Sequence, residues 1–449
     1  MATRLARAEF RLSPASANII RASEFPSRSQ LKLCNLHTTT KLFKMTSNGT
    51  YKNGATDGIL AEQGKARLFK LSPPPSLDAF KAICEQKATR EQYPLAADVK
   101  KNIPIYNLGE WSTLTEEQKL ALQDEWYRVL LHGPGVLVTA GLYKDHSVID
   151  KATATYARII QKENEGTKIS GDHFAGAGKN DRIWNSFSKH GLEDPASFLS
   201  YYSNPYLDLI FGSWLGPGYR VTAQVNNVRP GGQPQVSHRD YHLGFMSTER
   251  CGGYPRAMQV ASQCLTLQGA VAHVDVPLES GPTRLLPFSQ SFSAGYMAYR
   301  LPEFNEFFLE KYVTLPLQKG DGLFFNPALF HAAGENKSSD INRLVNLLQI
   351  SSAFGKPMET IDALPLVEST WDNLTTLYKA KGLSDEVKMF VSAVGEGYPF
   401  PTNLDNNPPK NENMAPDSEQ DIILGALVKG KNKAEVVADL ETFRTKIKA

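Results

Sequence analysis

The pattern of hydrophobic and polar positions predicts a central region of strands flanked by helices. Apolar residues recur at helical spacing in six segments, which are residues 77–91, 116–131, 147–164, 195–214, 418–428 and 433–446. Short runs rich in β-branched or aromatic residues, which are typical of strands, occupy residues 136–139, 221–228, 322–331 and 343–352. Thr115 and Gln118 have the spacing of a capping box before the second helix. The chain is therefore predicted to be α+β, with its strands concentrated in the middle.

One stretch of the strand region carries metal-binding residue types at alternate positions. Residues 221–244 read VTAQVNNVRPGGQPQVSHRDYHLG, and a second strand after the Gly/Pro turn would carry His238, Asp240 and His242 on one face. An imidazole and a carboxylate about 6 to 7 Å apart along a strand face can turn onto one ion. His242 is expected to lie too far along the strand to reach that ion, which favours a supporting or substrate-side role.

A third ligand is available downstream, where an apolar run ends at His331 and Arg343 opens the next run. His238, Asp240 and His331 form the two-His-one-carboxylate set of non-haem Fe(II) oxygenases, which leaves coordination positions open. The planar guanidinium of Arg343 suits bidentate capture of a carboxylate such as the distal one of 2-oxoglutarate.

The chain also contains a competing motif with the same spacing. His273 and Asp275 form a second His-x-Asp pair, which likewise precedes His331. The run AVAHVDVPLESGP around them reads as a strand entering a turn. The alternative to a ligand role for His273 is a packed or hydrogen-bonded strand histidine.

Three separated blocks resemble the iron(II)/2-oxoglutarate dioxygenase superfamily, especially its phytanoyl-CoA-hydroxylase-like members. The blocks are HRD at 238–240, GPTRLLPFSQ at 281–290 and GDGLFFNPALFH at 320–331, with Arg343 twelve residues on. Phe288 and Gln290 depart from the resembled family, where a Gly and a His are usual. The resemblance implies a double-stranded β-helix core, a cupin-like jelly roll of two facing sheets with the metal at one open end.

The resemblance also implies an activity and its cofactors. His238, Asp240 and His331 would hold Fe(II), Arg343 would bind 2-oxoglutarate, and O2 would take a remaining position. A small-molecule substrate would commonly be hydroxylated, with release of succinate and CO2. Gln224 and Asn226 lie just upstream and are candidate hydrogen-bond partners for the cosubstrate or a ligand, or else ladder-edge or surface residues. Two alternatives stay open, a cupin-like metalloprotein without 2-oxoglutarate and a non-catalytic binding protein on the same fold.

Composition and charge distinguish the N-terminal residues from the rest of the chain. Residues 1–45 carry eight Lys/Arg against two Glu, which suits a mitochondrial transit peptide, a disordered basic tail or an extension before initiation at Met45. Without them the formal charge changes from +2 to −4, which argues against a nucleic-acid partner. No window approaches the apolar length of a membrane span. Four Cys without a CxxC pair favour an intracellular compartment, cytoplasmic or mitochondrial.

These observations predict one elaborated domain after a leader and linker at residues 1–58. The domain is expected at 59–449, with a jelly-roll core at about 135–352 and a helical extension at 353–449. The last two helices are expected to cover the barrel or to form a homo-oligomer contact.

Overall fold

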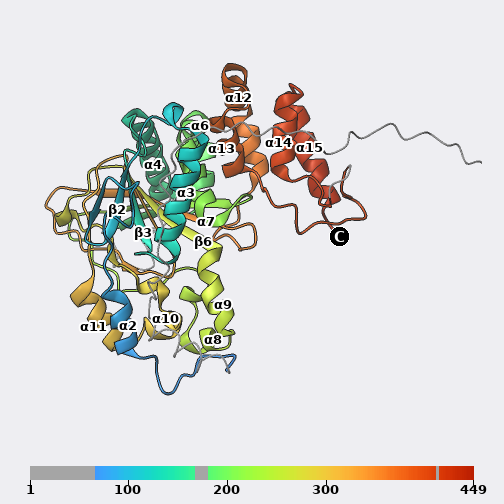
Figure 1. Ribbon diagram of the computed structural model, residues 1–449. Coiled ribbons are helices and arrows are strands. Elements are labelled where there is room, and N and C mark those ends of the chain that lie inside the picture. The colour runs from blue at the N-terminus through green and yellow to red at the C-terminus, as the bar shows by residue number, and fades with distance from the viewer. Residues whose placement is uncertain (1–65, 167–179, 411–413) are drawn as a thin grey trace, which may run out of the picture. The chain divides into compact units, whose positions relative to one another are not determined.

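A computed structural model describes residues 66–166, 180–410 and 414–449, and a sheet of eight strands lies at its centre (Figure 1). From edge to edge the strands are β1 (Asp98–Lys100), β2 (Ile103–Asn107), β3 (Val136–Ala140), β8 (Gly322–Phe325), β6 (Thr266–Ala272), β10 (Arg343–Ser351), β5 (Arg220–Val228) and β4 (Asn180–Ile183). β2 and β3 pair in parallel, and the other neighbours are antiparallel. Strands distant in sequence therefore become neighbours.

A smaller layer faces this sheet. It consists of β7 (Arg284–Leu286) and β9 (Phe330–Ala332), extended by isolated bridges that include the one between His238 and His331. Side chains of both layers share one apolar cluster, which joins Val138 and Phe325 of the main sheet to Leu285 and Leu317 of the smaller layer. Two facing sheets are the arrangement of a double-stranded β-helix, and the α+β prediction is confirmed.

The two faces of the main sheet differ in character because side chains alternate along each strand. Most outward side chains of β5, β6 and β10 are apolar and join the core formed with the helices, and the outward Asn346 donates to the hydroxyls of Tyr201 and Tyr202. The inward positions of the same strands carry carboxamides, namely Gln224, Asn226, Gln268 and Gln349, all of them buried. The sheet thus turns an unusually polar face toward the space between the layers.

Helices cover the outward face and extend beyond it. The described helices are α2 (Leu77–Cys84), α3 (Glu116–Leu131), α4 (His146–Gly166), α5 (Ser186–Glu193), α6 (Pro195–Tyr202), α7 (Pro205–Leu215), α8 (Thr248–Gly252), α9 (Arg256–Ala261), α10 (Gly295–Ala298), α11 (Pro302–Lys311), α12 (Ala363–Lys381), α13 (Asp385–Val394), α14 (Glu419–Val428) and α15 (Lys433–Lys446). Figure 1 shows α3, α4, α6 and α7 together along the sheet, with α2, α8, α10 and α11 at its opposite end.

Local signals in the sequence predicted several of these helices. The capping box of α3 is present, since Thr115 accepts from the backbone of Gln118 and the Gln118 side chain accepts from the backbone N–H of Thr115. The helix predicted at 195–214 is two helices, because Asn204 and Pro205 begin a new N-terminus. The helix predicted at 77–91 ends at Cys84. The final helices occur at the predicted positions, and their oligomer contact stays a prediction.

An aromatic cluster fastens the N-terminal helix α2 to the small layer. Phe80 is fully buried, and its ring lies 4.7 Å from that of Phe330, 5.3 Å from Phe292 and 5.1 Å from Phe304, centroid to centroid. Phe330 is the residue before His331 on β9. Residues near the start of the described chain therefore support the strand that carries a candidate metal ligand.

Two further expectations concern the chain as a whole. The basic leader and linker at 1–58 lie outside the described residues, and the domain boundaries stay a prediction. Within the ranges that the structure describes, every helix is too short or too polar to cross a membrane.

Candidate metal centre

The segment that carries His238 and Asp240 is extended but does not form the regular strand that its alternation predicts. One antiparallel bridge holds it, in which His238 N donates to His331 O at 2.9 Å and His331 N donates to His238 O at 3.1 Å. Asp240 N then donates to Pro327 O at 2.9 Å. The pairing ends there because the partner segment turns at Pro327, so the strand prediction is wrong beyond a single bridge while the alternation of side chains remains.

The structure brings the three predicted ligands together. Potential ligand atoms of His238, Asp240 and His331 all lie within 4.8 Å of one another. The Nε2 atoms of His238 and His331 lie 3.9 and 3.6 Å from the nearer carboxylate oxygens of Asp240. The side chain of His238 is 27% exposed, against 11% for Asp240 and 7% for His331, so the cluster opens to solvent on the His238 side.

A backbone carbonyl two residues earlier in the chain orients each imidazole ring. His238 Nδ1 lies 2.9 Å from the carbonyl oxygen of Val236, and His331 Nδ1 lies 2.8 Å from that of Leu329. A carbonyl only accepts, so each ring carries a proton on Nδ1, which leaves Nε2 as the nitrogen that can bind a metal. This is the tautomer that binds a metal through Nε2.

A carboxamide on the main sheet fixes the carboxylate. Gln268 Nε2 donates to Asp240 Oδ2 at 2.6 Å, and both residues are buried. Burial alone would raise the pKa of Asp240, but the two imidazoles and Gln268 outweigh it and hold the pKa below its ordinary value. Asp240 is therefore held as a carboxylate, the form that ligates a cation.

Arg239 points to the opposite side from the two ligands that flank it. Its Nη2 donates to the carbonyl oxygens of Ser289 at 2.6 Å and Phe292 at 3.0 Å. The guanidinium lies 5.2 Å from the ring centres of both Tyr296 and Phe330. The middle residue of the motif thus anchors the metal-binding segment to the small layer.

Arg343 is buried on the inward face of the main sheet. It begins β10, is 5% exposed, and donates from Nη1 to the carbonyl oxygens of Ser280 at 3.0 Å and Gly334 at 3.1 Å. Burial lowers the pKa of Arg343 to about 10, and no carboxylate in the described part of the chain offsets this. A buried guanidinium without a counter-charge is suited to an anionic ligand.

Gln224 and Asn226 are not ladder-edge or surface residues, because β5 lies between β10 and β4 and both side chains are buried. Their side chains share the inward face with that of Arg343. Gln224 Nε2 donates to the sulfur of Met358 at 3.1 Å, and Asn226 Oδ1 has no hydrogen-bond partner within the part of the chain that the structure describes. Their role toward a cosubstrate stays a prediction.

Sequence reasoning missed Gln268 and Gln349. Both are polar residues inside otherwise apolar strands, and that is the one signal the sequence offered. Their position beside the centre depends on the order of β6 and β10 in the sheet, which the sequence pattern does not reveal.

His242 lies outside the ligand cluster. It begins a 3-10 turn, η2 (His242–Phe245), with a φ of +50°, so it does not continue the face of the two ligands. Its Nε2 lies 3.4 Å from Thr266 Oγ1, and burial lowers the pKa of His242. The expectation that His242 is not an iron ligand agrees with this geometry.

The competing His-x-Asp pair does not form a metal site. His273 is fully occupied by hydrogen bonds, from Nδ1 to Thr153 at 2.9 Å and from Nε2 to Tyr201 at 3.0 Å. Asp275 accepts from the backbone N–H of Lys319 at 2.9 Å instead. His273 is therefore the packed, hydrogen-bonded histidine that was the alternative interpretation.

The burial of His273 predicts a pH dependence of stability. Burial, with smaller contributions from His190 and Lys319, lowers its pKa to about 3, so between pH 6.5 and 3 the unfolded chain binds a proton that the folded chain does not. Unfolding free energy should consequently fall as pH falls through this window, by about 2 to 3 kcal/mol for this one group at pH 4.5. Urea unfolding at pH 7 and 4.5 should show a smaller loss in His273→Gln than in the wild type.

The exposed His132 offers the control for that measurement. His132→Gln should lose as much stability between the two pH values as the wild type does. An equal loss in His273→Gln would contradict the assignment of the effect to His273.

Phe288 adopts a backbone conformation that normally selects glycine. Its φ is +69°, in the left-handed region, at the position where the resembled family usually has Gly. Gln290, the other departure, donates to the carbonyl oxygen of Gly133 at 2.7 Å and leaves its own Oε1 unpaired. Both departures from the family pattern therefore lie next to the small layer, and the three candidate ligands are unaffected.

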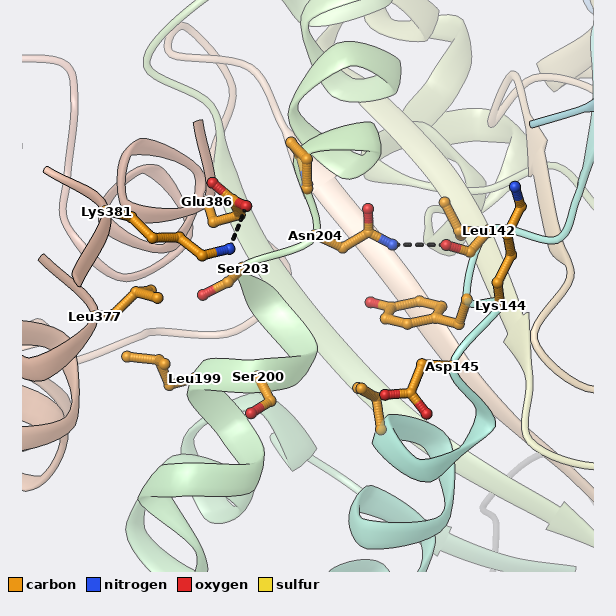
Figure 2. A pocket seen from close by; sticks show the side chains of 13 residues that line it. Leu142, Lys144, Asp145, Leu199, Ser200, Ser203, Asn204, Leu377, Lys381 and Glu386 are labelled. Atoms are coloured by element: carbon orange, nitrogen blue, oxygen red, sulfur yellow. Dashed lines mark hydrogen bonds and ion pairs between the residues drawn. The ribbon is translucent and has the colours of Figure 1, made fainter. Parts of the chain in front are cut away.

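A pocket of about 460 Å³ lies elsewhere in the molecule. Figure 2 shows Leu199, Ser203, Leu377 and the Lys381–Glu386 ion pair together on one side, and Asn204, bonded to Leu142, on the other side with Lys144 and Asp145. Several of its apolar residues belong to the core between sheet and helices, and it contains none of the candidate ligands. Pocket size therefore does not locate the metal chemistry in this protein.

Comparison with known proteins adds independent observations. Residues 119–344 match the family model described as phytanoyl-CoA dioxygenase (PhyH). Dioxygenase trt7 of Aspergillus terreus is 28% identical over 149 residues, which cover 33% of this chain and 46% of that protein. Dioxygenase cdmD of Talaromyces verruculosus is 27% identical over 162 residues, covering 36% and 48%. The chain spans about half the length of these curated relatives.

Solved structures show weaker similarity. The α-ketoglutarate-dependent epimerase SnoN from nogalamycin biosynthesis is 20% identical, with a TM-score of 0.37, over 52% of this chain and 82% of that one. HygX from Streptomyces hygroscopicus is 14% identical, with a TM-score of 0.35, over 55% and 91%. Values this low do not indicate a shared function.

Proposed function

This chain belongs to the phytanoyl-CoA dioxygenase (PhyH) family, and from this premise we propose that it is an iron(II)- and 2-oxoglutarate-dependent dioxygenase acting on a small molecule. The observation that carries the proposal is the convergence of two Nε2 atoms and one carboxylate, with a buried and uncompensated Arg343 beside the same inner face. Two imidazoles and a carboxylate are the ligand set of non-haem iron oxygenases.

The described residues fit such cofactors. His238, Asp240 and His331 would hold the metal, and Gln268 would keep the carboxylate turned toward it. Arg343 would pair with the distal carboxylate of 2-oxoglutarate, and its lack of a counter-charge favours a bound anion. When bound, iron with 2-oxoglutarate and O2 supplies an oxidation that releases succinate and CO2 and commonly hydroxylates a substrate carbon.

The protein's own contribution is orientation. Backbone carbonyls fix both imidazole rings, and Arg239 anchors the segment that carries His238 and Asp240. Asn226 and Gln224 lie on the inward face of β5 and offer amide groups to the cosubstrate. The partly exposed edge of His238 would be the side from which a substrate approaches.

Anaerobic titration of the Fe(II)-loaded protein with 2-oxoglutarate tests this proposal. A weak visible charge-transfer band should appear in the wild type and stay absent in Asp240→Ala, because the band requires iron and cosubstrate in one complex. Absence of the band in fully iron-loaded wild type would instead indicate a cupin-like metalloprotein. Failure of the wild type to retain iron would indicate a non-catalytic binding protein.

A further inference from the structure

Two glutamine side chains stand next to each other beside the metal centre. Gln268 on β6 and Gln349 on β10 occupy paired positions of antiparallel strands, so both side chains point to the inward face with Cβ atoms about 5 Å apart. Because Gln268 donates to Asp240, this pair lies at the level of the metal ligands. Both side chains are buried, at 5% and 7% exposed.

Both glutamines present an unused acceptor. The orientation of Gln268 is settled by chemistry, since a carboxylate only accepts and the amide nitrogen must face Asp240. Its Oε1 consequently points away, and among the described residues neither this atom nor Gln349 Oε1 has a hydrogen-bond partner. Buried carbonyl oxygens are costly to leave unpaired, so a pair of them marks a place for a donor.

The cosubstrate is chemically unable to supply this donor. At neutral pH 2-oxoglutarate carries two carboxylates and a keto group, all of which accept hydrogen bonds. The acceptors of Gln268 and Gln349 therefore belong to the substrate side of the centre.

We propose that the substrate presents a hydroxyl or N–H group to the carboxamide oxygens of Gln349 and Gln268, next to the carbon that is oxidised. This inference rests on the proposed function and narrows its substrate class to donor-bearing polar molecules, as opposed to a plain hydrocarbon chain. Gln349 is the residue to vary in a test, because a change at Gln268 would also remove its hydrogen bond to Asp240.

Matched probe pairs test the inference on protein loaded with Zn(II) and 2-oxoglutarate. The pairs are 2-naphthol with 2-methoxynaphthalene, indole with 1-methylindole, and cyclohexanol with methoxycyclohexane, so that each pair differs in one donor. Ligand-observed NMR should show that donor members bind about tenfold or more tightly than their methylated partners, because a methyl group leaves the buried acceptors unpaired.

In Gln349→Met, which keeps the side-chain length and removes the acceptor, the donor preference should fall to about twofold or less. Gln349→Leu serves as a second apolar variant, and the exposed Gln86→Leu as the control that keeps the full preference. Three results would overturn the inference. The first is equal binding of both members of every pair by the wild type, and the second is absence of binding by every probe. The third is a full donor preference in both Gln349 variants.

The charge-transfer titration separates this inference from the proposed function. If the wild type and Gln349→Met both show the band and the wild type has no donor preference, the inference is refuted while the dioxygenase proposal stands. A wild type that lacks the band would refute the dioxygenase proposal and this inference with it.

Discussion

Asp240→Ala is expected to lower the affinity for iron(II) by at least about a hundredfold. Asp240 is the one carboxylate of the described cluster, and even outer partners of metal ligands are worth 10- to 100-fold in affinity. The variant also leaves the Nε2 atoms of His238 and His331 without the negative charge between them. Anaerobic calorimetry with Fe(II), together with thermal unfolding to verify folding, measures the loss.

The chain provides its own control for this substitution. Asp275→Ala removes a carboxylate from the same His-x-Asp spacing, but this carboxylate accepts from the backbone of Lys319 and lies outside the cluster. Iron affinity should be unchanged in Asp275→Ala. Loss of iron in that variant with retention in Asp240→Ala would reverse the assignment of the two motifs.

Arg343→Ala is expected to weaken 2-oxoglutarate binding by about 10- to 150-fold, while iron affinity stays within about twofold of the wild type. The range corresponds to about 1.5 to 3 kcal/mol, the contribution of hydrogen bonds to a charged group. Iron affinity is spared because Arg343 is not part of the ligand cluster. Titration of iron-loaded protein with 2-oxoglutarate, followed through the charge-transfer band, gives the cosubstrate affinity, and anaerobic calorimetry with Fe(II) gives the iron affinity.

Arg343→Lys separates charge from shape. It keeps the positive charge and loses the planar fork, so its 2-oxoglutarate affinity should fall between those of the wild type and the alanine variant. Since Arg343 also donates to Ser280 and Gly334, thermal unfolding of both variants controls for local damage. An unchanged cosubstrate affinity in Arg343→Ala would disprove this role.

The candidate ligands could be predicted because the features that select them are local in sequence. His238 and Asp240 are two residues apart, and His331 follows an apolar strand behind a Lys-Gly-Asp turn. His238 and Asp240 lie on one side of the segment, and Arg239 points to the other side, as the alternation of side chains predicts. This holds even though His238 forms the one β-bridge of the segment, with His331. Local patterns of this kind are what a single sequence conveys.

The supporting residues could not be predicted in the same way. Gln268 reaches Asp240 only because β6 lies between β8 and β10, an order set by pairing between distant segments. His242 looked like a continuation of the ligand face, but a positive φ turns the chain there. The short strands β1 and β2 were missed because a lysine-rich segment and Pro104 conceal their pattern.

The same distinction holds for the helices. The start of α3 was predictable from Thr115 and Gln118, which are neighbours in sequence and satisfy each other's backbone groups. The end of α2 was not, since Cys84 is followed by residues that are compatible with a longer helix.

The packing of α2 has a consequence for how the centre is assembled during synthesis. Phe80 emerges from the ribosome early, but its partners Phe292, Phe304 and Phe330 follow more than 200 residues later. Until they are made, the aromatic face of α2 has nothing to pack against and is open to chaperones or to wrong contacts. Because Phe330 also contacts Arg239, the metal-binding segment can take its final position only after residue 330 has been synthesised.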